Sequence, residues 1–199
     1  MVVRVVFFPG ASGAAGFWAP VADRMPDGWP TRLLSWPGAG AERHDPAIAD
    51  YGALVDRAAA AVAEGSDVVA QSMGGVVAIG LALAYPQRIR RLVLVATSGG
   101  IDVGRFGAED WRAEYQSEFP GAASWLTEQH VDYSGELPGI EVPVCLIWGE
   151  EDPISPPAVG RALQAALPRS SLHIIPGGTH MMARERPDEI AALIVSHLS

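Results

Sequence analysis

Short apolar runs alternate along this chain with stretches of helical character. Six apolar segments are predicted to be strands, at residues 2–8, 31–35, 66–70, 89–96, 144–148 and 172–175. Helical patterns lie between them, at residues 17–25, 48–64, 73–85, 157–167 and 187–198. Continuous apolar runs are typical of parallel strands that are covered on both faces. The pattern therefore predicts an α/β fold, with a six-stranded, mostly parallel sheet between two layers of helices.

One long segment interrupts this alternation. No convincing strand pattern occurs between Thr97 and Val142, and two helices are predicted there, near residues 108–118 and 122–130. We expect a single domain of residues 1–199, with a small helical cap inserted at about residues 98–141.

Aromatic side chains mark one face of the first cap helix. Trp111, Tyr115 and Phe119 follow one another at intervals of four residues, so they lie along one side of a helix. This stripe could anchor the helix on the body of the protein, or it could roof an apolar substrate pocket. The two roles are compatible, because a roof must also be packed.

The composition supports a globular domain. Hydrophobic residues make up 49% of the 199 residues and charged residues 19%. The apolar run at residues 5–8 is too short for the core of a signal peptide, and no stretch approaches the roughly 18 apolar residues of a membrane span. The single cysteine, Cys145, lies in an apolar run and is expected to be buried. A chain without an intramolecular disulfide fits a reducing compartment, so we expect a cytoplasmic protein.

The negative charge is concentrated in the predicted cap. The net charge is −9, and residues 98–141 hold nine acidic side chains and two arginines, which leaves −7 in that segment. Nucleic acids and anionic membrane surfaces are therefore poor candidate partners. We expect a small-molecule substrate, with neutral compounds favoured over strongly anionic ones.

A serine lies in the turn between one predicted strand and the next helix. Ala70, Ser72 and Gly74 form a small-x-Ser-x-Gly pattern, which is needed where strand and helix almost collide. Such a turn exposes the serine hydroxyl in a strained backbone conformation that tends to persist at functional sites. A serine here could also be an ordinary helix N-cap. The pattern alone therefore does not decide between a nucleophile and a cap.

Residue types that could complete a catalytic site follow two later strands. Gly149 opens a turn that leads to Asp152, and a glycine loop after residues 172–175 leads to His180. Parallel sheets place their sites at the carboxyl ends of strands. A neutral histidine can take the proton of a serine hydroxyl, and a carboxylate can orient the imidazole.

Other residues compete for these roles less well. Glu150, Glu151 and Asp102 are alternative acids. The remaining four histidines do not follow a glycine loop at a strand end: His44, His130, His173 and His197.

No pair of histidines or cysteines has the spacing of metal ligands, and the glycine-rich loop after the first strand lacks the pattern of a phosphate-binding loop. We therefore expect no metal and no cofactor.

Residues 70–75, 148–153 and 178–180 resemble the three signature blocks of the α/β-hydrolase superfamily. The resemblance covers essentially the whole chain and is strongest to small single-domain carboxylesterases, among them the pimeloyl-carrier-protein methyl ester esterases. It implies the α/β-hydrolase fold and a triad of Ser72, His180 and Asp152, because Asp152 matches the Gly-x-x-Asp spacing of the family. Some members carry the acid after the preceding strand, which keeps Asp102 as an alternative.

The resemblance also implies an oxyanion hole formed by the backbone amides of Ala11 and Met73. Many relatives have His-Gly where this chain has Pro9 and Gly10, and a Phe-Pro pair at this point is similar to type II thioesterases. We expect a serine hydrolase that cleaves small neutral carboxylic esters through an acyl-enzyme. A thioesterase of acyl-carrier or acyl-CoA substrates would use the same triad. A non-catalytic binding protein of this fold would typically have lost a triad member.

Overall fold

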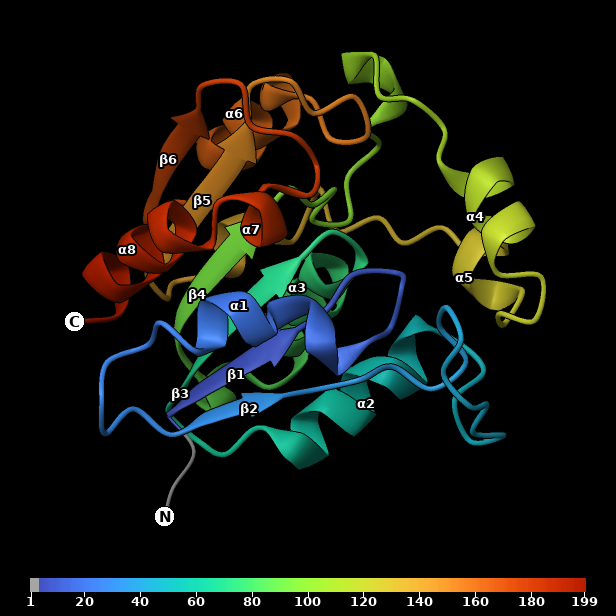
Figure 1. The fold of residues 1–199 in the computed structure, drawn as a ribbon, viewed down its shortest axis with the longest axis horizontal. Coiled ribbons are helices and arrows are strands. Elements are labelled where there is room, and N and C mark those ends of the chain that lie inside the picture. The colour runs from blue at the N-terminus through green and yellow to red at the C-terminus, as the bar shows by residue number, and fades with distance from the viewer. Residues whose placement is uncertain (1–3) are drawn as a thin grey trace.

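The computed structural model describes residues 4–199 and contains one six-stranded sheet (Figure 1). The strands are β1 (Val5–Phe8), β2 (Thr31–Leu33), β3 (Ser66–Gln71), β4 (Ile89–Val95), β5 (Val144–Gly149) and β6 (Ser170–Ile175). They lie in the order β2-β1-β3-β4-β5-β6, and every neighbouring pair is parallel. The prediction of six strands and a parallel sheet is therefore confirmed. Val2 and Val3, the second and third residues of the chain and part of the first predicted strand, lie outside the described residues.

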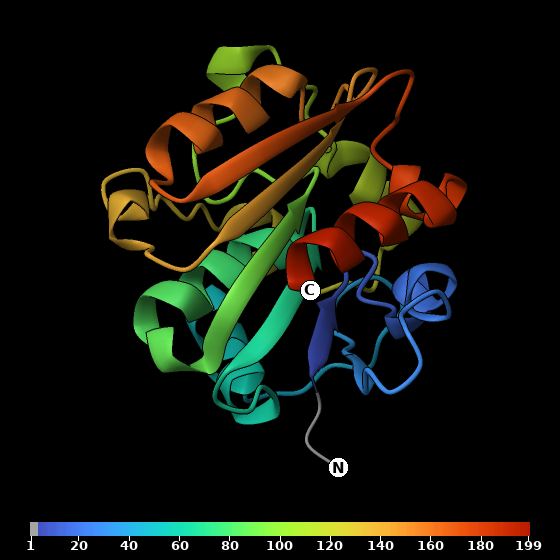
Figure 2. The same ribbon diagram turned by 90° about the vertical axis from the view of Figure 1, so that its left-hand side faces the viewer.

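Helices cover both faces of the sheet, as parallel strands require of their crossover connections. One layer consists of α1 (Ala19–Ala22), α7 (Met182–Glu185) and α8 (Pro187–Leu198), and the other of α2 (Tyr51–Ala61), α3 (Met73–Ala84) and α6 (Pro157–Ala166). Figure 2 shows α8 on one side of the strands and α3 and α6 on the other. Short 3-10 helices complete the chain, at Ala15–Trp18, Pro86–Arg88, Gly104–Phe106 and Leu137–Gly139.

Proline positions explain where the helices differ from the prediction. The helix predicted at residues 17–25 is split into a 3-10 turn and α1, with Pro20 in the first turn of α1. The four-residue helix α7 was not predicted, because it is too short to show a helical period. Pro187 ends α7 and begins α8, since the residue before a proline is forced out of the helical conformation.

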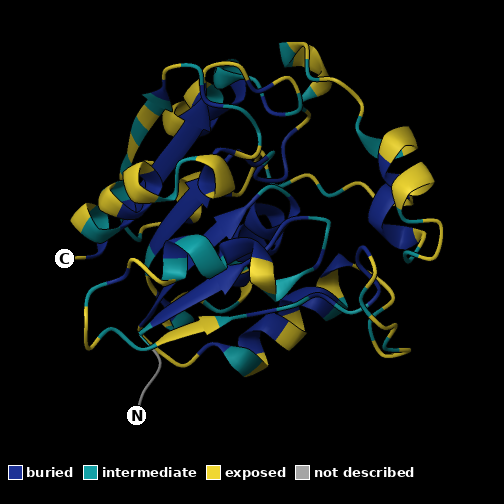
Figure 3. Ribbon diagram, viewed as in Figure 1, coloured by how far each residue is buried: buried dark blue, intermediate teal, exposed yellow. Residues whose placement is uncertain are grey.

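The segment predicted as a cap connects β4 to β5 and carries α4 (Arg112–Glu118) and α5 (Trp125–Glu128). Both helices are shorter than predicted, and none of residues 98–141 is in a strand. Trp125 stacks edge-on against Tyr51 of α2, with ring centroids 5.2 Å apart. In Figure 3 most of α4 is exposed, with Tyr115 as its buried residue, whereas α5 is largely buried. The segment is therefore packed onto the same core as α2 and α3.

Two further properties bear on the sequence-based expectations. No helix within residues 4–199 has the length and apolar character of a membrane span. Cys145 is buried in β5 and is not in a disulfide, and its burial raises the pKa of the thiol to about 11.

Candidate active site

Ser72 lies between β3 and α3 in a backbone conformation that is unusual for a residue with a side chain. Its φ is 52° and its ψ is −126°. Hydrogen bonds from the end of β4 and from Thr97, which follows it, hold this conformation. The Ser72 amide donates to the Val95 carbonyl at 3.0 Å, and the Thr97 hydroxyl donates to the Ser72 carbonyl at 2.6 Å. The surrounding structure thus stabilises the strained backbone conformation of Ser72, as is typical of functional sites.

The small residues around Ser72 are required by the close approach of α3 to the rest of the fold. A Cβ atom on Gly74 would lie 2.3 Å from the Pro9 carbonyl oxygen. One on Gly75 would lie 2.4 Å from the Thr97 hydroxyl. Ala70 is fully buried in β3. The small residue at position 74 is therefore required by the close approach of α3 to the loop after β1, and the one at position 75 by its approach to Thr97.

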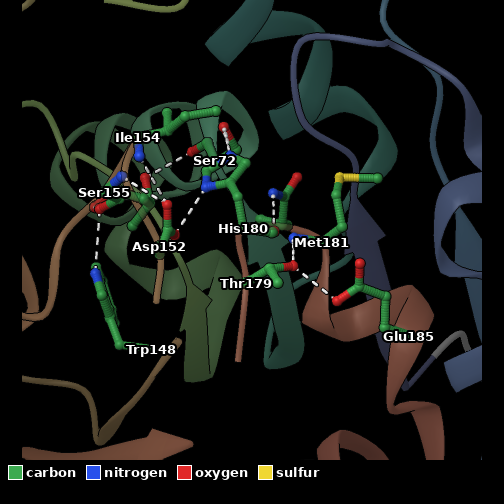
Figure 4. A network of polar contacts seen from close by, with 11 residues as sticks. Ser72, Trp148, Asp152, Ile154, Ser155, Thr179, His180, Met181 and Glu185 are labelled. Carbon is green, nitrogen blue, oxygen red and sulfur yellow. Dashed lines mark hydrogen bonds and ion pairs between the residues drawn. The ribbon is translucent and has the colours of Figure 1, made fainter. Parts of the chain in front are cut away.

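His180 connects Ser72 to Asp152 (Figure 4). Its Nε2 lies 3.1 Å from the Ser72 hydroxyl, and its Nδ1 lies 2.8 Å from Asp152 Oδ2. The Asp152 side chain is 0% exposed and that of His180 is 14% exposed. The other Asp152 oxygen, Oδ1, accepts hydrogen bonds from the amides of Ile154 and Ser155, each at 2.9 Å. These donors replace the water that a buried carboxylate loses.

A second group of polar contacts supports the loops that carry these residues. The Trp148 indole donates to the Ser155 hydroxyl at 3.1 Å, and this hydroxyl donates to the Thr97 carbonyl at 3.1 Å. Thr97 therefore touches both the turn of Ser72 and the loop of Asp152. The sequence analysis missed Ser155 and Thr97. Only their positions, three residues after Asp152 and two residues after β4, could have indicated them.

The alternative acids are engaged elsewhere. Glu150 accepts a hydrogen bond from the Gly177 amide at 3.0 Å, and Asp102 accepts one from the Gly104 amide at 3.0 Å. Both side chains are exposed, and so is Glu151. Among the described residues, Asp152 is the acidic side chain that contacts His180.

The loop after β1 approaches Ser72 closely. A Cβ atom on Gly10 would lie 3.1 Å from Cβ of Ser72. The Gly13 amide donates to the Gly10 carbonyl at 3.0 Å, which makes a tight turn around Ala11. Within residues 4–199 the Ala11 amide donates to no other protein group, and Met73 has no acceptor because it is the first residue of α3. Both predicted oxyanion donors are therefore unengaged.

A cavity of about 600 Å³ opens beside Ser72 and His180. Buried, largely apolar side chains form part of its wall: Tyr51, Met73, Val76, Ile101 and Leu126. Exposed charged side chains also line it: Asp102, Glu109, Asp110 and Asp132. Arg112 is half-buried there.

Burial and hydrogen bonding fix the protonation of several cavity residues. Burial raises the pKa of Tyr51 to about 12, so its hydroxyl stays protonated. Hydrogen bonds from the amide and guanidinium of Arg112 hold the pKa of Asp110 below its usual value. The hydroxyl and amide of Ser134 do the same for Asp132. Both carboxylates are therefore charged near neutral pH.

The aromatic stripe of the cap is divided between two roles. The three rings lie in a row, with ring centroids 5.3 Å apart between Trp111 and Tyr115 and 5.2 Å apart between Tyr115 and Phe119. Trp111 lines the cavity, but Tyr115 and Phe119 do not. The prediction that all three line a pocket is therefore wrong for Tyr115 and Phe119. Residues four apart on one helix lie one turn apart along its axis, and only the first turn of α4 reaches the cavity.

No cluster of three or more histidine, cysteine, aspartate or glutamate side chains within residues 4–199 is arranged to hold a metal ion.

Comparison with known proteins identifies the family. The model of the alpha/beta hydrolase family matches residues 5–193. A pimeloyl-[acyl-carrier protein] methyl ester esterase of Neisseria meningitidis is 26% identical over 85% of this chain and 83% of its own length. A 2-hydroxy-6-oxononadienedioate/2-hydroxy-6-oxononatrienedioate hydrolase of Cupriavidus pinatubonensis is 24% identical over 96% of this chain and 83% of its own length.

Solved structures agree on the fold. A hydrolase from Pseudomonas aeruginosa PA01 has a TM-score of 0.81 at 20% identity, over 100% of this chain and 90% of that chain. The enol-lactonase of Burkholderia xenovorans LB400 has a TM-score of 0.80 at 18% identity, over 100% and 92%. The match to the family model spans nearly the whole sequence. This chain is thus a member of the alpha/beta hydrolase family.

Proposed function

We propose that this protein is a serine hydrolase that cleaves carboxylic esters through an acyl-enzyme. The observation that carries this proposal is the unbroken contact from the Ser72 hydroxyl through His180 to the buried Asp152. A hydroxyl is a weak nucleophile until a neighbouring base takes its proton, and the imidazole lies within reach of it. A non-catalytic protein of this fold would have no need to keep all three side chains in contact.

The reaction follows from these positions. Ser72 Oγ bonds to the ester carbonyl carbon while His180 Nε2 takes the hydroxyl proton. The amides of Ala11 and Met73 donate to the oxyanion that forms on the carbonyl oxygen. When the carbon–alcohol bond breaks, His180 returns the proton to the departing alcohol. A water molecule then gives a proton to His180 and attacks the carbonyl carbon of the acyl-enzyme. When the bond from this carbon to Ser72 Oγ breaks, His180 returns the proton to Oγ, and the carboxylic acid is released.

Asp152 acts on His180 rather than on the substrate. Its Oδ2 accepts a hydrogen bond from the Nδ1–H group, which keeps Nε2 free to accept from Ser72. The same contact stabilises the imidazolium that forms during attack. The names of the relatives, a methyl ester esterase and a hydrolase, support chemistry of this type.

Labelling with a fluorophosphonate probe tests the nucleophile. We expect the probe to modify the parent protein and to leave Ser72→Ala unmodified, because the probe forms its bond with an activated serine. Ser98→Ala is the matched control, since Ser98 lines the same cavity without contacting His180. Labelling of Ser72→Ala at the parent rate would overturn the proposal.

We infer further that the substrates are small neutral esters. Four carboxylates and one guanidinium line the cavity, and at least Asp110 and Asp132 are held in the charged form. A carboxylate on the substrate would be repelled by these charges, which we expect to lower its affinity about fivefold. The nitrophenyl ester of hexanoate should therefore have a kcat/KM about fivefold above that of the adipate half ester. The difference should shrink at high salt.

Two variants locate the source of this preference. Glu109→Gln should reduce it, because Glu109 lines the cavity. Glu118→Gln removes an equal charge from α4 away from the cavity and should leave it unchanged. Much faster hydrolysis of thioesters on an acidic carrier protein than of neutral short-chain esters would replace this proposal with a thioesterase.

A further inference from the structure

The hydroxyl of Tyr115 joins three segments that are distant in sequence. Tyr115 lies in α4 and is 7% exposed. Its hydroxyl donates to the Ala11 carbonyl at 2.9 Å, 104 residues away, and accepts from the Gly40 amide at 2.8 Å, 75 residues away. The cap helix is thereby tied to the loop after β1 and to the loop after β2.

Most carbonyl groups at the end of β1 and in the loop after it accept hydrogen bonds from protein donors that do not line the cavity. The indoles of Trp18 and Trp36 donate to the carbonyls of residues 8 and 9, at 2.8 and 2.7 Å. The Gly10 carbonyl accepts from the Gly13 amide, and the Gly13 carbonyl accepts from the Trp36 amide. Within residues 4–199, Tyr115 is the protein donor to the Ala11 carbonyl.

This arrangement decides which groups of the loop remain available to a substrate. The Ala11 amide donates to no protein group within residues 4–199, and it follows Gly10, on which a Cβ atom would lie 3.1 Å from Cβ of Ser72. This amide shares a peptide plane with the Gly10 carbonyl, which accepts from the Gly13 amide, and the Ala11 carbonyl in the adjoining peptide plane is held from α4. The loop after β2 packs tightly against the loop after β1, because a Cβ atom on Gly40 would lie 2.1 Å from the Ser12 carbonyl oxygen.

We propose that Tyr115 is a positioning residue for the oxyanion hole, so that docking of α4 sets the orientation of the Ala11 amide. This inference rests on the proposed serine-hydrolase function. Oxyanion donors must be preorganised at the place where charge develops, and a misplaced donor loses much of its effect. The substrate's ground state gains little from such a donor. The hydroxyl of Tyr115 therefore supports turnover rather than substrate binding.

The chemistry of the tyrosine suits this role. Burial raises the pKa of Tyr115, so the hydroxyl remains a donor near neutral pH. The rings of Trp111 and Phe119 pack on both sides of it. Tyr115→Phe therefore keeps the packing of the ring and removes only the hydrogen bonds.

Kinetics of Tyr115→Phe test this inference. We expect kcat to fall about tenfold and KM to stay within about twofold, as for an interaction made only in the transition state. The inhibition constant of a trifluoromethyl ketone, which forms a tetrahedral oxyanion with the serine, should rise about tenfold. Active sites are counted with the fluorophosphonate probe, so that loss of folded protein is not read as loss of kcat.

Two variants separate the hydroxyl from the packing. Tyr133→Phe is the matched control, because Tyr133 is a half-buried tyrosine of the same segment that does not line the cavity. It should match the parent in kcat and in ketone affinity. Phe119→Leu weakens the ring packing and keeps the Tyr115 hydroxyl, so it should lower the melting temperature more than it lowers kcat.

The results distinguish this inference from the function on which it rests. If Ser72→Ala retains the parent activity, the proposed function fails. If activity depends on Ser72 and Tyr115→Phe keeps the parent kcat and ketone affinity, the positioning role is overturned and the serine-hydrolase function stands. A lower melting temperature of Tyr115→Phe with an unchanged kcat per labelled site also overturns it, because the hydroxyl would then serve stability alone.

Discussion

Replacing His180 by alanine is expected to lower kcat for a neutral ester about 10⁶-fold, and replacing Ser72 in the same protein should cost little more. In the proposed mechanism the two side chains act as one unit, because the hydroxyl is nucleophilic only while the imidazole can take its proton. Once either is lost, the remaining rate comes from the oxyanion donors and substrate binding, which both variants keep. The single and double variants should therefore have similar residual rates.

Steady-state kinetics of Ser72→Ala, His180→Ala and the double variant measure this non-additivity. His130→Ala is the matched control, because His130 lines the same cavity and does not contact Ser72. It should stay within a few-fold of the parent. Losses that multiply in the double variant would show that the two side chains act independently, which contradicts the proposed mechanism. A loss in His130→Ala as large as that in His180→Ala would do the same.

The sheet could be predicted from the sequence because its strands are apolar on both faces. The run predicted at residues 144–148 is β5, and its residues are all buried. Burial on both faces leaves a continuous apolar signal that no exposed helix would produce. Element ends were predicted less well, as α5 shows. The helical pattern at residues 122–130 yields only Trp125–Glu128, because the flanking residues are used in loop contacts with the segment after β2.

The contact among Ser72, His180 and Asp152 could be anticipated because each follows a strand of a parallel sheet. Residues in such places converge at one edge of the sheet whatever their separation in sequence. The choice of Asp152 over Asp102 came from a family spacing, and the structure brings Asp152 to His180 at 2.8 Å. The catalytic roles of these residues remain predictions for the experiments proposed above.

The contacts of Tyr115 could not be predicted from the sequence. Helical spacing put Tyr115 on one face with Trp111 and Phe119, but it contains no information on what that face meets. The partners of its hydroxyl are backbone groups in two loops. Every residue has such groups, so the sequence does not indicate which of them the hydroxyl contacts. Which residues of the stripe reach the cavity depends on how α4 docks, and docking is a tertiary property.

Replacing Asp152 by asparagine is expected to lower kcat about 10⁴-fold with little effect on the fold. The side chain's Oδ1 position accepts from the amides of Ile154 and Ser155, so the asparagine must place its oxygen there. Its NH₂ group then faces His180 Nδ1, which can only accept from it. The proton of the neutral imidazole is forced onto Nε2, and Nε2 can no longer take the Ser72 proton.

Asp102→Asn is the matched control, since Asp102 lines the cavity and is one of the acids that the sequence offers as an alternative to Asp152. Its carboxylate contacts the Gly104 amide rather than His180, so kcat should stay within a few-fold of the parent. Equal melting temperatures of Asp152→Asn and the parent would show that the loss is chemical. A 10⁴-fold loss in Asp102→Asn with an active Asp152→Asn would instead move the acid to the end of β4. In that case His180 would have to turn away from Asp152 when substrate binds, because one Nδ1 proton cannot be directed to both carboxylates.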